Sequence, residues 1–507
     1  MNRFTRARRL FRRGLALCSL LAILSLWVQI DGLAGSRGLL PAARAQEAFE
    51  ASAWGDDWRW RPTLLWLDAS DGMLHGLCAA GAALALLMAL DLAPALCALL
   101  LWAVYLSLCW ACGVFLNFQW DTLLLETLLV AAVWLPWRLG RERRDAPDPP
   151  CALGRWLVAW IVFRLLFESG VVKLTSGDPT WRDLSAMTFH YMTQPLPHGA
   201  SWWVHHLPRW VHQGAVLGTF AAELVAPFLV LAWGRGRHLR HAGAAAIVGL
   251  QLGIGATGNY GFFGLLTIVL CLPLLDDRLL RVRPSVPARL PAPRRVAAGA
   301  QRVAAGALAV PIVALSALQL HDLWGAPGLR LDRRQVDQGV VATFREDGWL
   351  PALRLAELRA QPFLSVNAYG LFRVMTTERP GVRVQGSLDG ETWVDYPFRW
   401  QVDALDERPG WAQPHMPRLD WQLWFESLRR QPYRTTPWFG NLLRRLLDAE
   451  PAVLGLLAED PFDGRKPRAV RATLVDHRFT TPEEHAADGA WWVETPLYPI
   501  WITVQGT

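Results

Sequence analysis

The chain has 507 residues, enough for two or three domains, of which 52% are apolar and only 19% are charged. Soluble domains carry about 25% charged residues, so this deficit points to a protein that resides in lipid. The first 319 residues carry a net charge of +10 and the remainder −3, so the basic surplus belongs to the hydrophobic part. Cytoplasmic loops between membrane spans account for such a surplus, and no nucleic-acid partner is expected.

Nine apolar windows are candidates for membrane-spanning helices, since about 20 apolar residues cross a hydrocarbon core of about 30 Å. They cover residues 13–30, 73–91, 94–116, 120–137, 153–173, 213–233, 241–257, 259–275 and 298–318. Gly258 and Asn259 interrupt a stretch that could form one kinked hairpin, so seven or eight spans are alternatives to nine. The first window follows six arginines and precedes Ala43-Arg44-Ala45, as in a secretory signal peptide. Because Ala45 lies roughly fifteen residues beyond the apolar core, we expect an uncleaved span.

The charges of the loops indicate how these spans are oriented. Cytoplasmic loops are enriched in Lys and Arg, so the arginine-rich N-terminus is expected in the cytoplasm. With nine spans, every basic loop then falls on the cytoplasmic side, namely residues 138–144, 235–240 and 278–295. The long loop 174–212 falls on the other side. We therefore predict a polytopic α-helical membrane domain over residues 1–319 and a soluble extracytoplasmic domain over residues 320–507.

The C-terminal region has the pattern of a β-rich domain. Short β-type runs occur at residues 382–385, 393–396 and 398–402. Asp389-Gly390, between the first two runs, is a hairpin signal. Short helices are expected at residues 423–428 and 442–447. No cysteine occurs beyond residue 320, so this domain is predicted to be stable without disulfides. We predict a β-rich domain with helical insertions, of which a β-sandwich is one form.

Three charged residues lie in the outer half of the fifth window: Arg164, Glu168 and Lys173. Charged side chains inside a span are costly and usually face a partner or a cavity. Arg164 and Glu168 are four residues apart, so they share a helix face and can pair. Glu126 in the fourth window is a further partner for Arg164 or Lys173. The pattern predicts either a polar site at the membrane surface or a structural tie between helices, with Lys173 extending to the interface.

The loop 174–212 is the other candidate site, because it holds five of the twelve histidines. Asp178-Pro179 is a helix start, and the helix is expected to continue to about Tyr191. His190 joins Lys173, Glu168 and Arg164 as a catalytic candidate. The candidates for client or substrate binding are Trp181, Arg182, Asp183, Tyr191, Gln194, His205 and His206.

No metal site and no cofactor are predicted. His205, His206 and His212 lack the spacing and the carboxylate partner of a zinc site, and histidines beside tryptophans are typical of a membrane interface. The chain has no Gly-x-Ser-x-Gly, no Walker sequence and no Gly-x-Gly-x-x-Gly that opens a helix after a strand. Serine hydrolases, nucleotide hydrolases and dinucleotide-dependent enzymes are therefore disfavoured.

Cys109 and Cys112 have the Cys-x-x-Cys spacing of a dithiol that exchanges disulfides with a client protein. They lie at the outer end of an apolar window, without the βαβ pattern of thioredoxin-like proteins. Apolar surroundings disfavour the reactive thiolate, so inert buried cysteines are the alternative to a redox pair.

Several segments resemble the lipase maturation factor family, in the family's order along the chain. They include FRLLFESGVVKL, WRDLSAMTFHYMTQPLPHGASWWVHHLPRW, IDGLAGSRGLLPA, AYGLFRVMTTERP, VQGSLDGETWVDYPFRW, PRLDWQLWFESL, PWFGNLLRRLL, DPFDGRKPRAVRA and GAWWVETPLYP. The resemblance implies an integral membrane protein that helps secreted lipases to fold or assemble, as its eukaryotic relatives do in the endoplasmic reticulum. Only two lysines stand among 51 basic residues, which is typical of a GC-rich bacterial genome. We therefore expect the bacterial inner membrane, with a periplasmic C-terminal domain.

The favoured hypothesis is thus a non-enzymatic factor that lies in membrane lipid and engages a secreted client, a lipase by resemblance. Trp421, Trp424, Trp438 and Trp491 are candidate anchors for the client, and the favoured alternative is that most of them form the core of the C-terminal domain. The alternative is a membrane enzyme that acts on a lipid-soluble substrate or quinol through Lys173 and neighbouring polar residues, among them Glu168 and the nearby histidines. That alternative rests on a looser resemblance of the membrane half to vitamin K-dependent carboxylases, in which a membrane lysine acts as a base.

Overall fold

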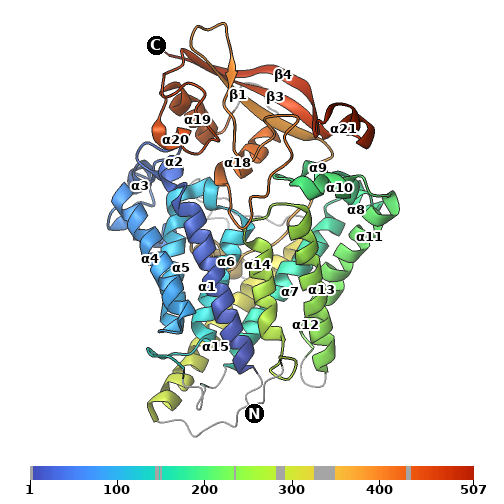
Figure 1. The fold of residues 1–507 in the computed structure, drawn as a ribbon. Helices are drawn as coiled ribbons and strands as arrows, with labels where there is room; N and C mark the ends of the chain where they lie inside the picture. The colour runs from blue at the N-terminus through green and yellow to red at the C-terminus, as the bar shows by residue number, and fades with distance from the viewer. Residues whose placement is uncertain are drawn as a thin grey trace.

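The computed structural model describes residues 4–142, 148, 151–232, 236–280, 292–324, 349–429 and 435–506. Parts of the predicted basic loops and the start of the predicted C-terminal domain lie outside these ranges. The helices of the first 324 residues form an upright bundle, with the N-terminus at its lower end (Figure 1). A smaller domain with a β-sheet covers the upper end of the bundle, so the two predicted kinds of structure lie one above the other.

Each of the nine predicted windows lies on helical structure. The elements are α1 (Thr5–Trp27), α4 (Asp71–Ala89), α5 (Pro94–Cys112), α6 (Gln119–Trp134), α7 (Ala152–Thr175), α11 (Arg209–Phe220) continued by η4 (Ala221–Val225) and α12 (Ala226–Val230), α13 (Arg237–Thr257), α14 (Phe263–Cys271) and α15 (Ala292–Trp324). Within the described residues, five helical stretches are long and apolar enough to cross a membrane. The others fall short because, for example, α6 has 16 residues and α7 carries four charged ones. The bundle is therefore a membrane domain, while the count of nine spans is not confirmed.

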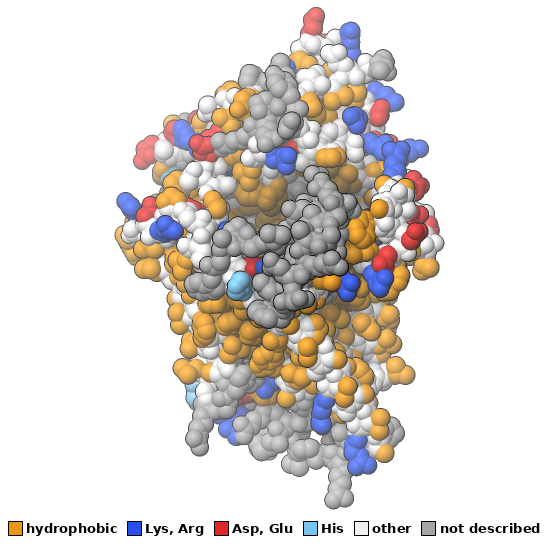
Figure 2. All heavy atoms as spheres, turned by 180° about the vertical axis from the view of Figure 1, so that it is seen from behind, with side chains coloured by type: hydrophobic (Ala, Val, Ile, Leu, Met, Phe, Trp, Pro, Cys, Tyr) orange, Lys and Arg blue, Asp and Glu red, His pale blue; other side chains and the backbone are white. Residues whose placement is uncertain are grey.

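The surface of the bundle is apolar where lipid would contact it. Hydrophobic side chains cover most of the helical part seen in Figure 2, whereas charged side chains gather over the upper domain and at the lower end. Exposed leucines on the outward faces of the helices include Leu86, Leu99, Leu217 and Leu252. Exposure of this apolar surface to water is unfavourable, and the hydrocarbon chains of a bilayer provide it with an apolar environment.

Several loops meet the start of α1 at the lower end. Arg8 contacts Glu142 at 2.6 Å, and Arg138 contacts Asp91 at 2.7 Å. The first N–H groups of α1 donate to the carboxylate of Asp277, at 2.9 and 3.0 Å. The connections that follow α4, α6 and α14 therefore lie together at the N-terminal end of the bundle, as the alternation of basic loops predicts.

The upper domain contains one four-stranded antiparallel sheet in the described residues. Its strand order is β2 (Val394–Asp395), β1 (Arg379–Ser387), β3 (Ala469–Phe479) and β4 (Trp492–Gln505). The predicted runs 382–385 and 393–396 lie on β1 and β2, and the helices α18 (Arg418–Ser427) and α19 (Pro437–Leu447) contain the two predicted short helices. Helices and loops accompany this sheet, and the predicted β-sandwich is not confirmed.

The predicted strand at residues 398–402 is wrong, since this segment is irregular. Its main-chain N–H groups bond to side chains instead of to a neighbouring strand. Phe398 N–H donates to the carboxylate of Asp403, and Trp400 N–H donates to Asp420 Oδ1 at 3.0 Å. Aspartate side chains that accept main-chain hydrogen bonds compete with a sheet ladder for the same donors. The hairpin prediction is confirmed, because Asp389 accepts the N–H groups that close the turn between β1 and β2.

A buried ion pair joins the upper domain to the bundle. Arg418 at the start of α18 contacts both carboxylate oxygens of Asp121 on α6, at 2.6 and 2.8 Å, and both side chains are fully buried. Tyr105 on α5 donates to the same carboxylate at 2.6 Å. A bidentate pair of this kind fixes orientation as well as distance. The pair could not be predicted from the sequence, because nothing local links α6 to residue 418.

Aromatic packing continues this junction. Trp421 packs edge-on against Trp120 of α6, with ring centroids 4.7 Å apart. Trp421, Trp424 and Trp438 are all buried, whereas Trp491 is half-buried. Three of the four tryptophans proposed as alternative client anchors therefore belong to the core and to the contact between the two parts.

We predict that Arg418→Ala destabilises the purified protein by about 3–5 kcal/mol, because the change leaves the carboxylate of Asp121 buried without its partner. Thermal unfolding in detergent, followed by size-exclusion chromatography, measures the effect. The double variant Arg418→Met with Asp121→Leu should recover part of the loss, since apolar groups replace both charges while the buried Tyr105 hydroxyl loses its acceptor. Arg59→Ala is the matched control, because the pair of Arg59 with Asp57 is exposed, and it should leave the unfolding midpoint unchanged.

Candidate functional site

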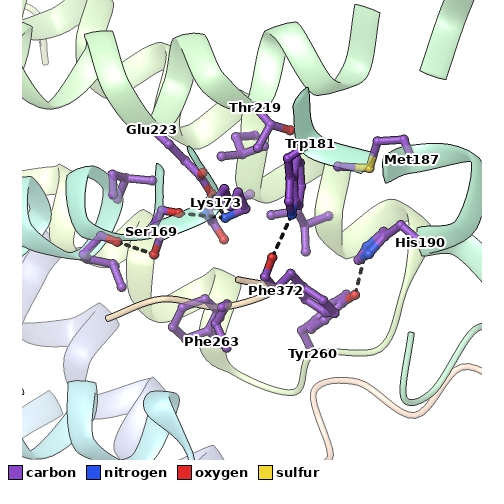
Figure 3. Close-up of a pocket in the computed structure, with 16 residues that line it drawn as sticks. Ser169, Lys173, Trp181, Met187, His190, Thr219, Glu223, Tyr260, Phe263 and Phe372 are labelled. Carbon is purple, nitrogen blue, oxygen red and sulfur yellow. Dashed lines mark hydrogen bonds and ion pairs between the residues drawn. The ribbon is translucent and has the colours of Figure 1, made fainter. Parts of the chain in front are cut away.

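Lys173 lies near the end of α7 and is buried. One of the alternatives drawn from the sequence, in which its side chain extends to the membrane interface, is therefore wrong. Only 4% of its side chain is exposed. Its Nζ lies 2.9 Å from Glu223 Oε1 and 3.2 Å from the carbonyl oxygen of Ser169. Figure 3 shows the ammonium group directed toward Glu223, with the ring of Trp181 at 5.3 Å from Nζ. The pair explains how a lysine is tolerated in an apolar helix.

Glu223 lies in a π-helical turn, η4, in the middle of the helix that begins as α11. Such turns bulge a helix locally and are frequent at functional sites. The turn approaches α7 closely at Gly170, where a Cβ would lie 2.6 Å from Leu224 Cδ2 and 3.0 Å from Glu223 Cβ. Glycine at position 170 therefore permits the contact between Lys173 and Glu223. Glu223 is not among the residues predicted from the sequence, although a carboxylate inside an apolar window is a signal of a functional or structural role.

A partly open cavity of about 80 Å³ lies next to this pair (Figure 3). Residues of α7, α11, η4, α13 and α14 form its walls, together with Trp181, and Leu371 and Phe372 reach it from the upper domain. Most of the lining is apolar. The polar side chains that line it are Ser169, Lys173, His190, Thr219, Glu223, Gln251 and Tyr260.

A chain of hydrogen bonds fixes the proton positions on one wall. Tyr260 donates its hydroxyl proton to Gln194 Oε1 at 2.7 Å, so its oxygen accepts from His190 Nε2 at 3.2 Å. His190 then carries its proton on Nε2 and leaves Nδ1 as an acceptor. Burial, reinforced by the positive charge of Lys173, lowers the pKa of His190 to about 4, so the ring is neutral at physiological pH.

Three acceptor atoms of the cavity have no hydrogen-bond partner within the described residues. They are His190 Nδ1, Glu223 Oε2 and Gln251 Oε1. Each belongs to a side chain that is more than nine-tenths buried. Unpaired acceptors are costly to bury, and they mark places where a bound molecule can donate. The cavity therefore has the composition of a binding site: an apolar wall with a few polar atoms that fix orientation.

Arg164 and Glu168, predicted as catalytic candidates, do not line this cavity. Arg164 lies 2.6 Å from Glu126 Oε1 and 3.4 Å from Glu168 Oε1, and all three side chains are fully buried. The remaining carboxylate oxygens accept hydrogen bonds from Tyr369, whose N–H donates to Glu168 and whose hydroxyl donates to Glu126, each at 2.7 Å. This cluster is a second tie between the bundle and the C-terminal part, and its polar groups are already paired.

The loop 174–212 forms three short helices, α8 (Pro179–Arg182), α9 (Ala186–Thr193) and α10 (Gly199–His205). The expected single helix to Tyr191 is wrong, because Leu184 has a left-handed backbone with φ of 63°. Asp183 accepts hydrogen bonds from the N–H and hydroxyl of Ser185, which favours a turn over a helix. The predicted start at Asp178 is confirmed, since its carboxylate accepts from Thr180 N–H.

The remaining binding candidates have different surroundings. Trp181 lines the cavity and donates to the carbonyl oxygen of Phe372 at 3.1 Å, while Tyr191 and Gln194 are buried behind it. Arg182 and Asp183 are exposed at the turn. His205 and His206 are half-buried, and the loop there contacts β3 through the rings of His205 and Phe479, 5.4 Å apart. Within the described residues, no group of three or more His, Cys, Asp or Glu side chains could hold a metal ion.

Cys109 and Cys112 lie in α5, and both thiols are free and buried. Neither lines the cavity. The geometry separates this pair from the Lys173 site.

The fold and the cavity define a class: an integral membrane protein whose helical bundle is tied to the upper domain by a buried ion pair and by hydrogen bonds to buried carboxylates. The family model for the lipase maturation factor transmembrane domain matches residues 6–282, and the model for the lipase maturation factor C-terminal domain matches residues 365–498. The chain therefore belongs to the lipase maturation factor family.

Named relatives agree with this assignment. The chain is 35% identical to Lipase maturation factor 2 of Homo sapiens, in an alignment that covers 96% of this chain and 80% of the relative. It is 31% identical to Lipase maturation factor 1 of Bos taurus, with 96% and 87% covered. No solved structure matches the chain.

We predict that Cys109 and Cys112 do not react with a maleimide in the folded protein, because burial excludes the reagent. Intact-mass measurement before and after denaturation counts the modified thiols. Full modification should require denaturant, and the Cys109→Ser/Cys112→Ser variant identifies the two sites. Rapid labelling of either thiol in the native state would contradict the prediction and would favour the redox pair.

Proposed function

We propose that this protein is a membrane-bound maturation factor that assists a secreted client protein to fold or assemble. The observation that carries the proposal is the match of both family domains, in order, in a chain of which 96% aligns with named lipase maturation factors. The names of these relatives suggest a lipase as the client. No catalytic step is required for this role, which accords with the absence of a hydrolase or nucleotide motif in the sequence.

We propose nine membrane spans, with the N-terminus in the cytoplasm and residues 320–507 outside it, in the periplasm of a bacterial cell. The contacts of Asp91, Glu142 and Asp277 with the start of α1 support this orientation, because the intervening loops then share one side. The upper domain lies at the opposite end of the bundle (Figure 1). Residues 174–212 would lie beside it and share the extracytoplasmic side.

The surface that would contact the client is the outer domain, where large apolar side chains are exposed. Tyr498 and Leu497 lie on β4, at one edge of the sheet, and Trp411 is 58% exposed. Edge strands and exposed aromatics are typical contact points for another chain. The buried Trp421, Trp424 and Trp438 do not serve this purpose, because a client could reach them only if the domain unfolded.

We predict that a photo-crosslinking amino acid at position 498 or 411 captures an exported client in native membranes. Position 139 is the matched control, because Leu139 is 76% exposed near the N-terminal end of the bundle. Mass spectrometry of the adducts identifies the partner. A secreted hydrolase captured from 498 or 411, but not from 139, supports the proposal, whereas equal recovery from all three positions contradicts it.

Deletion of residues 320–507 would not isolate the contribution of the C-terminal domain to client binding. The deletion would remove Arg418 and Tyr369, which pair with the buried carboxylates of Asp121, Glu126 and Glu168. The bundle itself would lose stability, and the loss of client capture would then have a second cause. Single substitutions at exposed positions avoid this ambiguity.

A membrane enzyme that acts on a lipid-soluble substrate is the second candidate function, and the cavity beside Lys173 favours it. Lys173 lies 2.9 Å from Glu223, so a substrate would meet an ion pair rather than an isolated lysine. Lys173→Gln separates the two roles. If the protein is an enzyme, the variant should lose turnover of the lipid-soluble substrate. If it is only a maturation factor, the wild type should show no such turnover, and client capture from position 498 should persist in the variant.

A further inference from the structure

The cavity beside Lys173 offers three unpaired hydrogen-bond acceptors, while most of its donor side chains are engaged within the protein. Its side-chain hydroxyls, indole and phenol each donate to the protein: Ser169 to Leu165 O, Thr219 to Ala215 O, Trp181 to Phe372 O and Tyr260 to Gln194 Oε1. In contrast, His190 Nδ1, Glu223 Oε2 and Gln251 Oε1 have no partner within the described residues. A molecule that satisfies this site must therefore donate hydrogen bonds. It can also accept them from the Gln251 amide and from Lys173 Nζ, which has two acceptors within the described residues for its three protons.

The charges of the cavity favour a neutral molecule. Lys173 and Glu223 contribute one charge of each sign and lie 2.9 Å apart, while His190 is neutral. The pair has no net charge, so a charged ligand would give up its hydration without a net Coulomb attraction in return. Hydroxyl groups donate without adding charge.

The size and position of the cavity indicate the rest of the molecule. A volume of about 80 Å³ holds several water-sized groups, which suits a polar head and its first carbon atoms. The same helical walls carry exposed Leu217, Val225 and Leu252 on their outer faces, where lipid would lie. A hydrocarbon chain attached to the polar head therefore has an apolar environment close to the cavity.

We propose that this cavity binds an uncharged lipid alcohol, whose hydroxyl groups donate to the unpaired acceptors while its hydrocarbon body contacts the apolar wall. The inference names a ligand for the site of the second candidate function, and it rests on the cavity alone. It requires neither turnover nor a client.

The test uses the purified full-length protein in nanodiscs and a monoacylglycerol that carries a diazirine in its acyl chain. After irradiation, mass spectrometry locates the label. Labelling should concentrate on peptides that contain Met187 and Ile254, which line the cavity. 1-Monooleoylglycerol should compete at a concentration about tenfold lower than methyl oleate or oleic acid, since the ester lacks a donor and the acid carries a charge.

Gln251→Leu should reduce labelling about five- to tenfold, because it removes one acceptor and leaves the ion pair intact. Leu239→Ala is the matched control, because Leu239 is an exposed leucine of the same helix, about three turns from Gln251, and does not line the cavity; it should label like the wild type. Glu223→Gln is a second variant, interpreted only if its unfolding midpoint matches that of the wild type. Binding is scored without turnover and without client capture, so failure of either proposed function leaves this outcome unaffected.

Three results would overturn the proposal. One is equal competition by the alcohol, the ester and the acid, which would mean that the apolar wall alone binds lipid. Another is labelling spread evenly over the lipid-facing helices. The third is unchanged labelling in a folded Gln251→Leu variant, which would mean that water alone satisfies the acceptors.

Discussion

Charge burial governs this structure, because every carboxylate placed inside the bundle needs a cation or a donor beside it. Asp121 is paired with Arg418, and Glu126 and Glu168 share Arg164 and the N–H and hydroxyl groups of Tyr369. The donors come partly from the C-terminal region, so the bundle and the outer domain stabilise one another. Pairs of this kind add little net stability over apolar packing, yet they are costly to break and they fix geometry. Their value here is the fixed position of the domain on the membrane part.

The same rule explains the cavity. Lys173 and Glu223 satisfy one another only in part, because Glu223 Oε2 remains without a partner in the described residues. Arg164 lies on the same helix as Lys173, but its guanidinium group is paired with Glu126 and Glu168. One charged cluster is thus closed and structural, and the other retains unused acceptors beside an apolar space. That difference separates a tie between helices from a candidate binding site.

The sequence predicts what is periodic or local. The apolar windows locate nine helical regions, the spacing of Arg164 and Glu168 predicts their contact, and Asp389-Gly390 marks the hairpin. The sequence does not predict partners that the fold brings together over long separations, such as Glu223 with Lys173. The strand β3 was missed because it is buried on both faces and lacks alternation, and β4 because Pro496 and Pro499 interrupt its pattern.

The pair of Asp121 and Arg418 also has a consequence for synthesis, because its members are 297 residues apart. A ribosome adds about 5–20 residues per second, so α6 enters the membrane roughly 15–60 seconds before residue 418 is made. During that interval the carboxylate of Asp121 has no arginine, and its site on the bundle is incomplete. The membrane part therefore reaches its final form only when the C-terminal domain has been made and docks on the bundle. A chain truncated before residue 418 therefore has an unpaired carboxylate at Asp121 within the bilayer, and a full-length chain does not.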